Sequence, residues 1–215
     1  HRILKINDEA LAHLRVPEAS GLVRIGAPDD YATSMLPSIL SKFSSRYPLI
    51  RIEVQCDLGV DLLRAQSEGA LDLVLATHRE ENVFGEVVRR EPLHWVAAQG
   101  YVDDPAEPLS LVLFPKGCVC RELALGALEN MERSWNVSYA TRSLAVMEGA
   151  ILSGAGVGVM EASVIPAGLR ILDGEPGFPP LPGVVISLHR WQREEAAHVS
   201  LVADHILSDL GPRKV

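Results

Sequence analysis

The sequence predicts an α/β fold of two lobes with mainly parallel sheets, and two observations indicate it. Strand and helix patterns alternate with short links from Gly21 to Ala97, and the same alternation starts again at Leu109. Such alternation is typical of parallel sheets, because a parallel connection needs a crossover that is usually a helix. The last strand and helix, between Val184 and Leu210, are expected to return to the first lobe.

The first lobe opens with a short apolar strand, Gly21–Gly26, followed by a polar loop and a helix that ends before Pro48. Pro37 fits only in the first turn of that helix, since a deeper proline would clash with the preceding turn. Apolar residues spaced three and four apart form the buried face of the helix, namely Leu36, Ile39, Leu40 and Phe43.

The remaining elements follow from the same periodicities. In the first lobe they are the strand Ile50–Val54, the helix Asp61–Glu68 closed by Gly69, the strand Leu71–Ala76, and the extended runs Val87–Val88 and Leu93–Ala97. In the second lobe they are the strand Leu109–Phe114, the helix Arg121–Met131, the strand Val137–Ala140, the helix Leu144–Leu152 and the strand Val157–Met160. The returning pair is the strand Val184–Leu188 and the helix Ala196–Leu210.

The chain is expected to cross between the lobes twice, near Ala97–Tyr101 and near Ile186–Arg190. Residues 1–20 then hold the end of a longer helix, residues 21–98 and 188–215 form the first lobe, and residues 99–187 form the second. Two crossings suit lobes hinged like a clamshell, with a ligand in the cleft between them.

The composition excludes several classes of function. The 215 residues are 47% hydrophobic, which is ample for a core, and the formal net charge is −8. Duplex binding needs a basic face, so this segment is not expected to bind DNA by itself. No stretch approaches the roughly 18 apolar residues of a membrane span. Three cysteines without a framework spacing indicate a reducing, cytoplasmic compartment.

Four short motifs carry a resemblance that covers nearly the whole chain. They are Gly21–Gly26, Leu36-Pro37 followed by Phe43 and Tyr47-Pro48, Glu68–Leu73, and Gly154–Gly158. In this order and spacing they resemble the effector-binding domain, also called the substrate-binding domain, of LysR-type transcriptional regulators. The resemblance implies a two-lobed fold like that of type 2 periplasmic binding proteins, which senses a small molecule and is not an enzyme.

The resemblance also implies parts that this chain lacks. The family places a DNA-binding helix-turn-helix first, then a linker helix, so residues 1–20 resemble the end of that linker and His1 suggests a fragment. A homodimer is implied in which Leu36–Phe43 of one copy packs near Leu144–Leu152 of its partner, with tetramers in intact members and promoter DNA bound through the missing domain. Asp29–Tyr31, Ala76–Arg79 and Leu93–Ala98 resemble the branch that regulates motility and virulence genes.

The effector is expected at the carboxyl ends of the strands, where the next helices begin. The family uses these positions, and here they are Pro28, Asp29, Asp30, Tyr31, Thr77 and His78 in the first lobe, and Pro115, Lys116, Gly117, Cys118, Thr141, Arg142 and Ser143 in the second. For three polar residues, capping a helix is an equally good interpretation: Asp30, Thr33 and Ser143.

Asp29 and Asp30 depart from the family pattern, since many relatives carry Ser or Thr there and take a carboxylate ligand. Two acidic groups repel an anion unless Lys116 and Arg142 face them. A zwitterionic, cationic or neutral effector is therefore one interpretation. An internal ion pair that closes the empty cleft is the other.

Other motifs favour structural roles. Cys118 and Cys120 lack the four ligands of a zinc site and are interpreted as reduced thiols, although a redox role stays open. The glycine run Gly154–Gly158 follows a helix and enters a strand, which is the reverse of a dinucleotide-binding loop. No metal, cofactor or nucleophile–base set is expected from the scattered histidines and serines.

Two alternative functions share this fold. A solute-binding protein of a transporter would have the same two lobes, but it should begin with a secretion signal, and the amphipathic segment before Gly21 disfavours it. An enzyme on the same fold is disfavoured only because no catalytic set is recognisable. The effector's identity, the target genes and the direction of regulation are not encoded in any recognisable motif.

Overall fold

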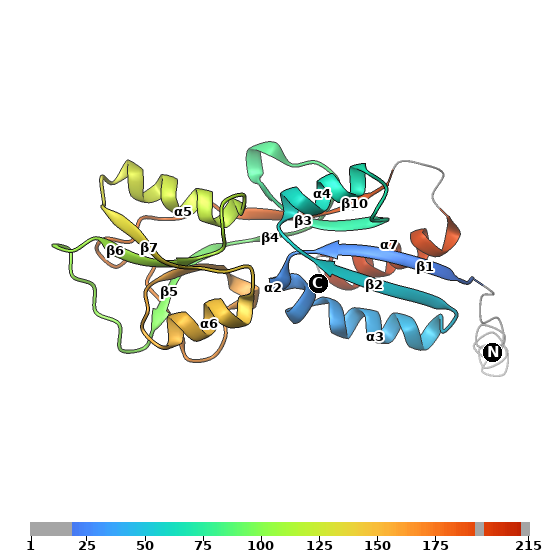
Figure 1. The fold of residues 1–215 in the computed structure, drawn as a ribbon, viewed down its shortest axis with the longest axis horizontal. Coiled ribbons are helices and arrows are strands. Elements are labelled where there is room, and N and C mark those ends of the chain that lie inside the picture. The colour runs from blue at the N-terminus through green and yellow to red at the C-terminus, as the bar shows by residue number, and fades with distance from the viewer. Residues whose placement is uncertain (1–18, 192–195, 212–215) are drawn as a thin grey trace, which may run out of the picture.

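The computed structural model describes residues 19–191 and 196–211, which form two lobes side by side (Figure 1). The expected linker helix over residues 1–20 lies, apart from Ala19 and Ser20, outside the described residues. Strands β4 and β10 lie where the chain passes from one lobe to the other (Figure 1). The predicted α/β class and two-lobed fold are confirmed.

The first lobe is built on one five-stranded sheet with the order β2-β1-β3-β10-β4. Strand β1 pairs in parallel with β2 and β3, whereas β10 is antiparallel to both of its neighbours because it returns from the second lobe. The strands are β1 (Gly21–Ala27), β2 (Ile50–Cys56), β3 (Leu73–Arg79), β4 (Glu86–Glu91) and β10 (Val184–Arg190).

The helices of the first lobe follow the predicted apolar pattern, with shifted ends. The α3 helix (Leu36–Arg46) has its proline in the first turn, and it buries Leu36, Ile39 and Phe43 as expected. A separate short helix, α2 (Asp29–Ser34), occupies what the sequence suggested was a polar loop. The others are α4 (Gly59–Ser67), α7 (Ala197–Leu210) and a 3-10 turn at Glu80–Asn82.

The second lobe has a similar arrangement of strands and helices. Strands β5 (Leu93–Ala98), β8 (Gly158–Glu161) and β9 (Leu169–Ile171) form an antiparallel sheet, and β6 (Leu109–Leu113) pairs in parallel with β7 (Trp135–Ala140). A parallel bridge between Leu111 and Val157 joins these sheets, which gives the strand order β7-β6-β8-β5-β9. The helices are α5 (Val119–Asn130), α6 (Leu144–Leu152) and a 3-10 turn at Ala162–Val164.

The chain passes between the two lobes at earlier positions than the sequence suggested, as the strand pairings show. Strand β5 pairs only with β8 and β9, so the chain enters the second lobe at Pro92 and not near Ala98. Strand β10 pairs with β3 and β4 from Val184 onward, so the chain has returned before residue 188. An apolar run does not encode which sheet it joins, which explains the difference.

The glycine run after α6 is a helix end and a tight turn. Gly154 has a φ of +84° directly after the C-cap residue Ser153, which is the usual place for a glycine. Gly156 then lies against β6, where Val157 donates its N–H to the Ser110 carbonyl at 2.8 Å. This arrangement excludes a dinucleotide-binding loop at the run, as predicted.

We predict that Gly156→Ala destabilises the protein by about 2–4 kcal/mol, because a Cβ atom there would overlap the carbonyl oxygen of Ser110. Chemical denaturation with both variants measures the free energy of unfolding. The control is Gly126→Ala in α5, where a Cβ atom meets nothing; we expect it to change stability by no more than about 1 kcal/mol. Equal effects of the two substitutions would contradict the close approach at Gly156.

Candidate effector site

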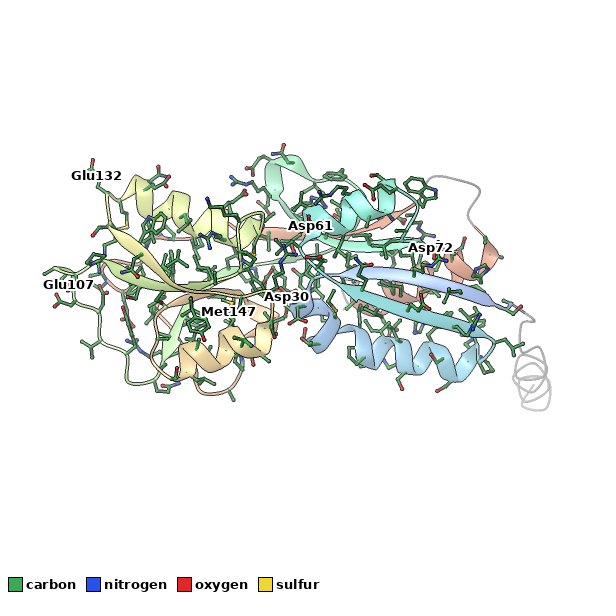
Figure 2. The ribbon with its side chains drawn as sticks, in the orientation of Figure 1. Asp30, Asp61, Asp72, Glu107, Glu132 and Met147 are labelled. Atoms are coloured by element: carbon green, nitrogen blue, oxygen red, sulfur yellow. The ribbon has the colours of Figure 1, made fainter. Side chains whose placement is uncertain are left out.

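A cavity of about 230 Å³ lies between the two sheets and takes its lining from both lobes. Figure 2 shows Asp30 at the junction of the lobes, with Met147 of α6 on the facing side. Part of the seam is apolar: Tyr31 shares one buried cluster with Leu144 and Met160 of the second lobe. The seam is thus packed around a hollow and is not filled throughout.

The first-lobe wall is made where β1 and β3 end. Asp30 lies in the first turn of α2 directly after β1, and Thr77 and His78 lie at the end of β3. Parallel neighbours end at the same edge of a sheet, which brings these side chains together. Tyr31 is fully buried beneath them and does not line the cavity itself.

The second-lobe wall is made at the start of α5 and α6 and at the end of β8. Cys118 is the N-cap residue of α5, and Glu161 is the last residue of β8. Arg142 lies just before α6 at the mouth of the cavity. Apolar side chains fill most of the remaining wall, among them Phe114, Val119 and Val159.

A buried hydroxyl joins the two lobes. The Tyr31 hydroxyl donates to Glu161 Oε1 at 2.9 Å and lies 3.0 Å from Thr77 Oγ1. The Cys120 thiol donates to the same Glu161 oxygen at 3.3 Å. Glu161 is therefore held by one group from each lobe.

Asp29 caps a helix of the opposite lobe. Its Oδ2 accepts the N–H of Leu144, the first residue of α6, at 2.7 Å. Ser143, the N-cap residue of α6, makes no side-chain cap of its own. The carboxylate thus occupies the helix N-terminus at which an anion is otherwise stabilised.

Ion pairs close the mouth of the cavity. Arg142 of the second lobe pairs with Asp57, and with Asp61 at 3.3 Å, both in the first lobe. Arg79 and Glu122 form a further pair between the lobes at 3.1 Å. One of the two interpretations of Asp29 and Asp30 was an internal ion pair that closes the cleft. Ion pairs do close it, but Arg142 pairs with Asp57 and Asp61 and not with Asp29 or Asp30.

Two acidic groups inside the cavity are deeply buried. Asp30 is 6% exposed and Glu161 is 4% exposed. Burial, reinforced by the neighbouring Glu161, raises the pKa of Asp30 well above its ordinary value, and burial also raises the pKa of Glu161. The pair therefore favours holding a proton when no cation is present.

The structure brings seven of the predicted site residues into the cavity wall: Pro28, Asp29, Asp30, Thr77, His78, Cys118 and Arg142. Gly117 lines it as well. Tyr31 lies behind the wall and contacts two lining residues, Thr77 and Glu161. Lys116 is exposed to solvent. Five of the predicted residues do not line the cavity: Tyr31, Pro115, Lys116, Thr141 and Ser143.

The capping interpretation fails for two of the three residues to which it was applied. Thr33 lies inside α2 and donates to the Asp29 carbonyl at 2.7 Å, and Ser143 makes no cap bond. Asp30 does accept a backbone N–H, that of Tyr31 at 2.8 Å, while it lines the cavity. For Asp30 the two interpretations coexist.

Several residues that line the cavity were not predicted from the sequence. Asp57, Leu58, Gly59 and Val60 follow β2 as Pro28–Asp30 follow β1, so the strand-end rule could have found them. Glu161 ends β8 and satisfies the same rule. No local pattern marks the others, which include Phe84, Phe114, Leu144 and Val164.

The cysteines remain free thiols. Cys118 and Cys120 both line the cavity, and neither forms a disulfide. Within residues 19–191 and 196–211, no group of three His, Cys, Asp or Glu side chains could hold a metal ion. Over the same residues, no helix is long and apolar enough to cross a membrane.

Comparison with known proteins defines the class. The family model described as LysR substrate binding domain matches residues 17–210. The chain belongs to this family, which occurs in transcriptional regulators and is not a family of enzymes. The similarity to regulators disfavours the transporter alternative. The narrower resemblance to a motility and virulence branch stays a prediction.

Two regulators and one solved structure illustrate the similarity. HTH-type transcriptional regulator DgdR of Burkholderia cepacia is 35% identical over 206 residues, which cover 95% of this chain and 70% of that protein. PecT of Dickeya dadantii is 32% identical over 84% of this chain and 57% of its own length. The regulatory domain of Synechocystis PCC6803 CcmR, in complex with 2-PG, has a TM-score of 0.73 at 15% identity, covering 90% of this chain and 99% of that one. At that identity the likeness shows the fold alone.

The buried position of Asp30 predicts a pH-dependent stability. Because the pKa of Asp30 is raised in the folded protein, the unfolded chain loses the proton first, and the free energy of unfolding falls as pH rises above about 4. Asp30→Asn cannot ionise, so it removes this decrease in the free energy of unfolding. We expect its thermal midpoint to exceed that of the parent by a few degrees at pH 8 and to converge with it near pH 4.

Thermal unfolding of both proteins between pH 4 and pH 8 measures this difference. The control is Glu107→Gln, which changes an exposed carboxyl group at the far end of the second lobe (Figure 2). We expect the control to follow the parent at every pH. A gap between Asp30→Asn and the parent that does not widen with pH would refute the assignment.

Proposed function

We propose that this chain is the effector-sensing and oligomerisation domain of a LysR-type DNA-binding transcription regulator. A small molecule binds in the cavity between the lobes and changes their relative position. That change alters how the DNA-binding part of the intact protein engages promoter DNA, and thereby alters transcription. We also propose that the protein works in the cytoplasm, where promoter DNA is found.

The observation that carries the proposal is a hollow whose walls come from both lobes and are joined by polar contacts. The Tyr31–Glu161 bond, the Asp29 cap on α6 and the Arg142 pairs all cross the seam next to the cavity. A ligand with different affinities for the closed and open arrangements shifts the balance between them. Family membership and a neighbour's complex with 2-PG support the same role.

We further propose a head-to-tail homodimer, and a tetramer for the intact protein. Exposed apolar side chains on the two lobes support it: Val54 lies on β2, an edge strand of the first sheet, and Val146 and Leu152 lie on α6. A pairing of α3 with the partner's α6 would cover Val146 on both copies. Such exposed apolar groups are typical of protein interfaces.

A cavity-filling substitution tests the sensing proposal. Val60 of the first lobe and Gly117 of the second both line the cavity and lie close together, so Val60→Trp places a large ring in the space that an effector would use. A screen of metabolites for thermal stabilisation of the parent identifies ligands. We expect stabilisation to be lost, or affinity to fall at least about tenfold, in the filled variant.

The control for this test is Val102→Trp, which adds the same ring at a position that is 86% exposed and away from the cavity. Ligand binding should survive in the control. The sensing proposal fails if ligands found for the parent stabilise Val60→Trp to the same extent.

A charge in the exposed apolar surface tests the dimer. Val146 is 46% exposed on α6, and we expect Val146→Asp to yield a monomer in light scattering at concentrations where the parent is a dimer. Val102→Asp serves as the control, because it introduces the same charge elsewhere in the second lobe. A dimeric Val146→Asp variant, or a monomeric parent, would contradict the proposed interface.

A further inference from the structure

The cavity between the lobes carries an excess of acidic groups. Four lining residues bear a carboxyl group, and Arg142 is the one arginine or lysine among the described residues that line it. Arg142 is already engaged by Asp57 and Asp61 at the mouth. The inner acidic residues, Asp30 and Glu161, form no ion pair with any described side chain.

Each inner carboxyl group is held by hydrogen-bond donors of the chain and by no cation. Asp30 Oδ1 accepts the Tyr31 N–H, and Glu161 Oε1 accepts from the Tyr31 hydroxyl and the Cys120 thiol. Each group also accepts its own backbone N–H, but no described arginine or lysine side chain pairs with either of them. A buried carboxylate without a cationic partner is costly, so a positive charge between these two groups would be stabilised.

Two helix starts near the cavity already have one of the chain's own carboxylates beside them. Asp29 occupies the N-terminus of α6 at 2.7 Å, and Asp57 accepts the N–H of Leu58 at the start of α4 at 2.8 Å. A carboxylate ligand would have to displace Asp29 and lie close to Asp30. No side chain caps the start of α4 or of α5, and the N–H groups there suit a neutral oxygen of a ligand.

The rest of the wall suits an apolar body. The aromatic rings of Phe84 and Phe114 and the aliphatic side chains of Val119 and Val159 line the same hollow. His78 is also part of this wall; burial lowers its pKa, so it is neutral at physiological pH. A volume of about 230 Å³ restricts the occupant to a compact molecule.

We propose that the effector of this cavity is a protonated amine on a compact apolar body, with its ammonium group between Asp30 and Glu161. This inference rests on the proposed sensing function and names the class of ligand. Because Asp30 comes from the first lobe and Glu161 from the second, the ammonium group links the two lobes directly. Binding of the amine therefore favours the closed arrangement.

Amine binding is coupled to loss of a proton. The raised pKa values of Asp30 and Glu161 favour a proton on the pair, and a bound ammonium group favours its release. Affinity for an amine should then rise with pH by up to about tenfold per unit, while the amine itself stays protonated. The other titratable or charged groups around the pair are Asp29, Tyr31, Asp57, His78, Glu91, Cys118, Cys120 and Arg142.

Three probes of one shape test the charge of the ligand. Cyclohexylammonium, cyclohexanol and cyclohexanecarboxylate are compared by thermal unfolding of the full chain at equal concentration and ionic strength, at pH 6 and pH 8. We expect the ammonium probe to raise the midpoint by about 3 °C at ten times its dissociation constant, and to do so at lower concentration at pH 8. The carboxylate should give no rise.

Asp30→Asn and Glu161→Gln show where the ammonium group binds. Both are expected to fold and to lose the response to the ammonium probe at least about tenfold in concentration. Glu107→Gln, at the far end of the second lobe (Figure 2), should respond as the parent does. An unchanged response in Asp30→Asn, or no response of the parent to the ammonium probe, overturns the proposal.

The outcomes also separate this inference from the sensing function. If the carboxylate or the alcohol stabilises the parent best and Val60→Trp abolishes that effect, the cavity senses a ligand but the amine assignment is wrong. If metabolites that stabilise the parent act equally on Val60→Trp, the cavity is not the sensing site and both proposals fail.

Discussion

The hydroxyl of Tyr31 is the contact on which the arrangement of the two lobes depends. The ring is fully buried in the first lobe, and its hydroxyl donates a hydrogen bond to Glu161 Oε1 of the second lobe at 2.9 Å. A hydrogen bond to a buried carboxylate is stronger than one between neutral groups, and losing it leaves the acid unsatisfied. Within the described residues the chain passes between the lobes at Pro92 and just before Val184, so contacts of this kind help to fix the distance and angle between the lobes.

Much of the fold could be predicted because periodicity and turn chemistry act locally. The buried face of α3, the proline in its first turn and the glycine after α6 all follow from residues a few positions apart. Sheet membership does not act locally. Strand β5 reads as one more apolar strand, and only its pairing with β8 and β9 assigns it to the second lobe.

The candidate site divides in the same way. Strand ends identified Asp30, Thr77 and Cys118 as lining residues, because parallel strands present their ends at one edge. The partners of these residues come from the other lobe and are distant in sequence. Arg142 pairs with Asp57 and Asp61, more than 80 positions away, and no motif in the chain encodes that choice.

The cap that Asp29 places on α6 supplies, from within the chain, the negative charge that this helix start would otherwise take from an anion. Separating the halves would strip the helix of its counter-charge and leave the N–H of Leu144 to find water instead. The contact therefore favours the arrangement of the two lobes that the structure shows. In such a regulator the basal level of transcription depends in part on this contact. Exchanging Asp29 for a neutral residue is a route by which evolution could change that level without altering DNA recognition.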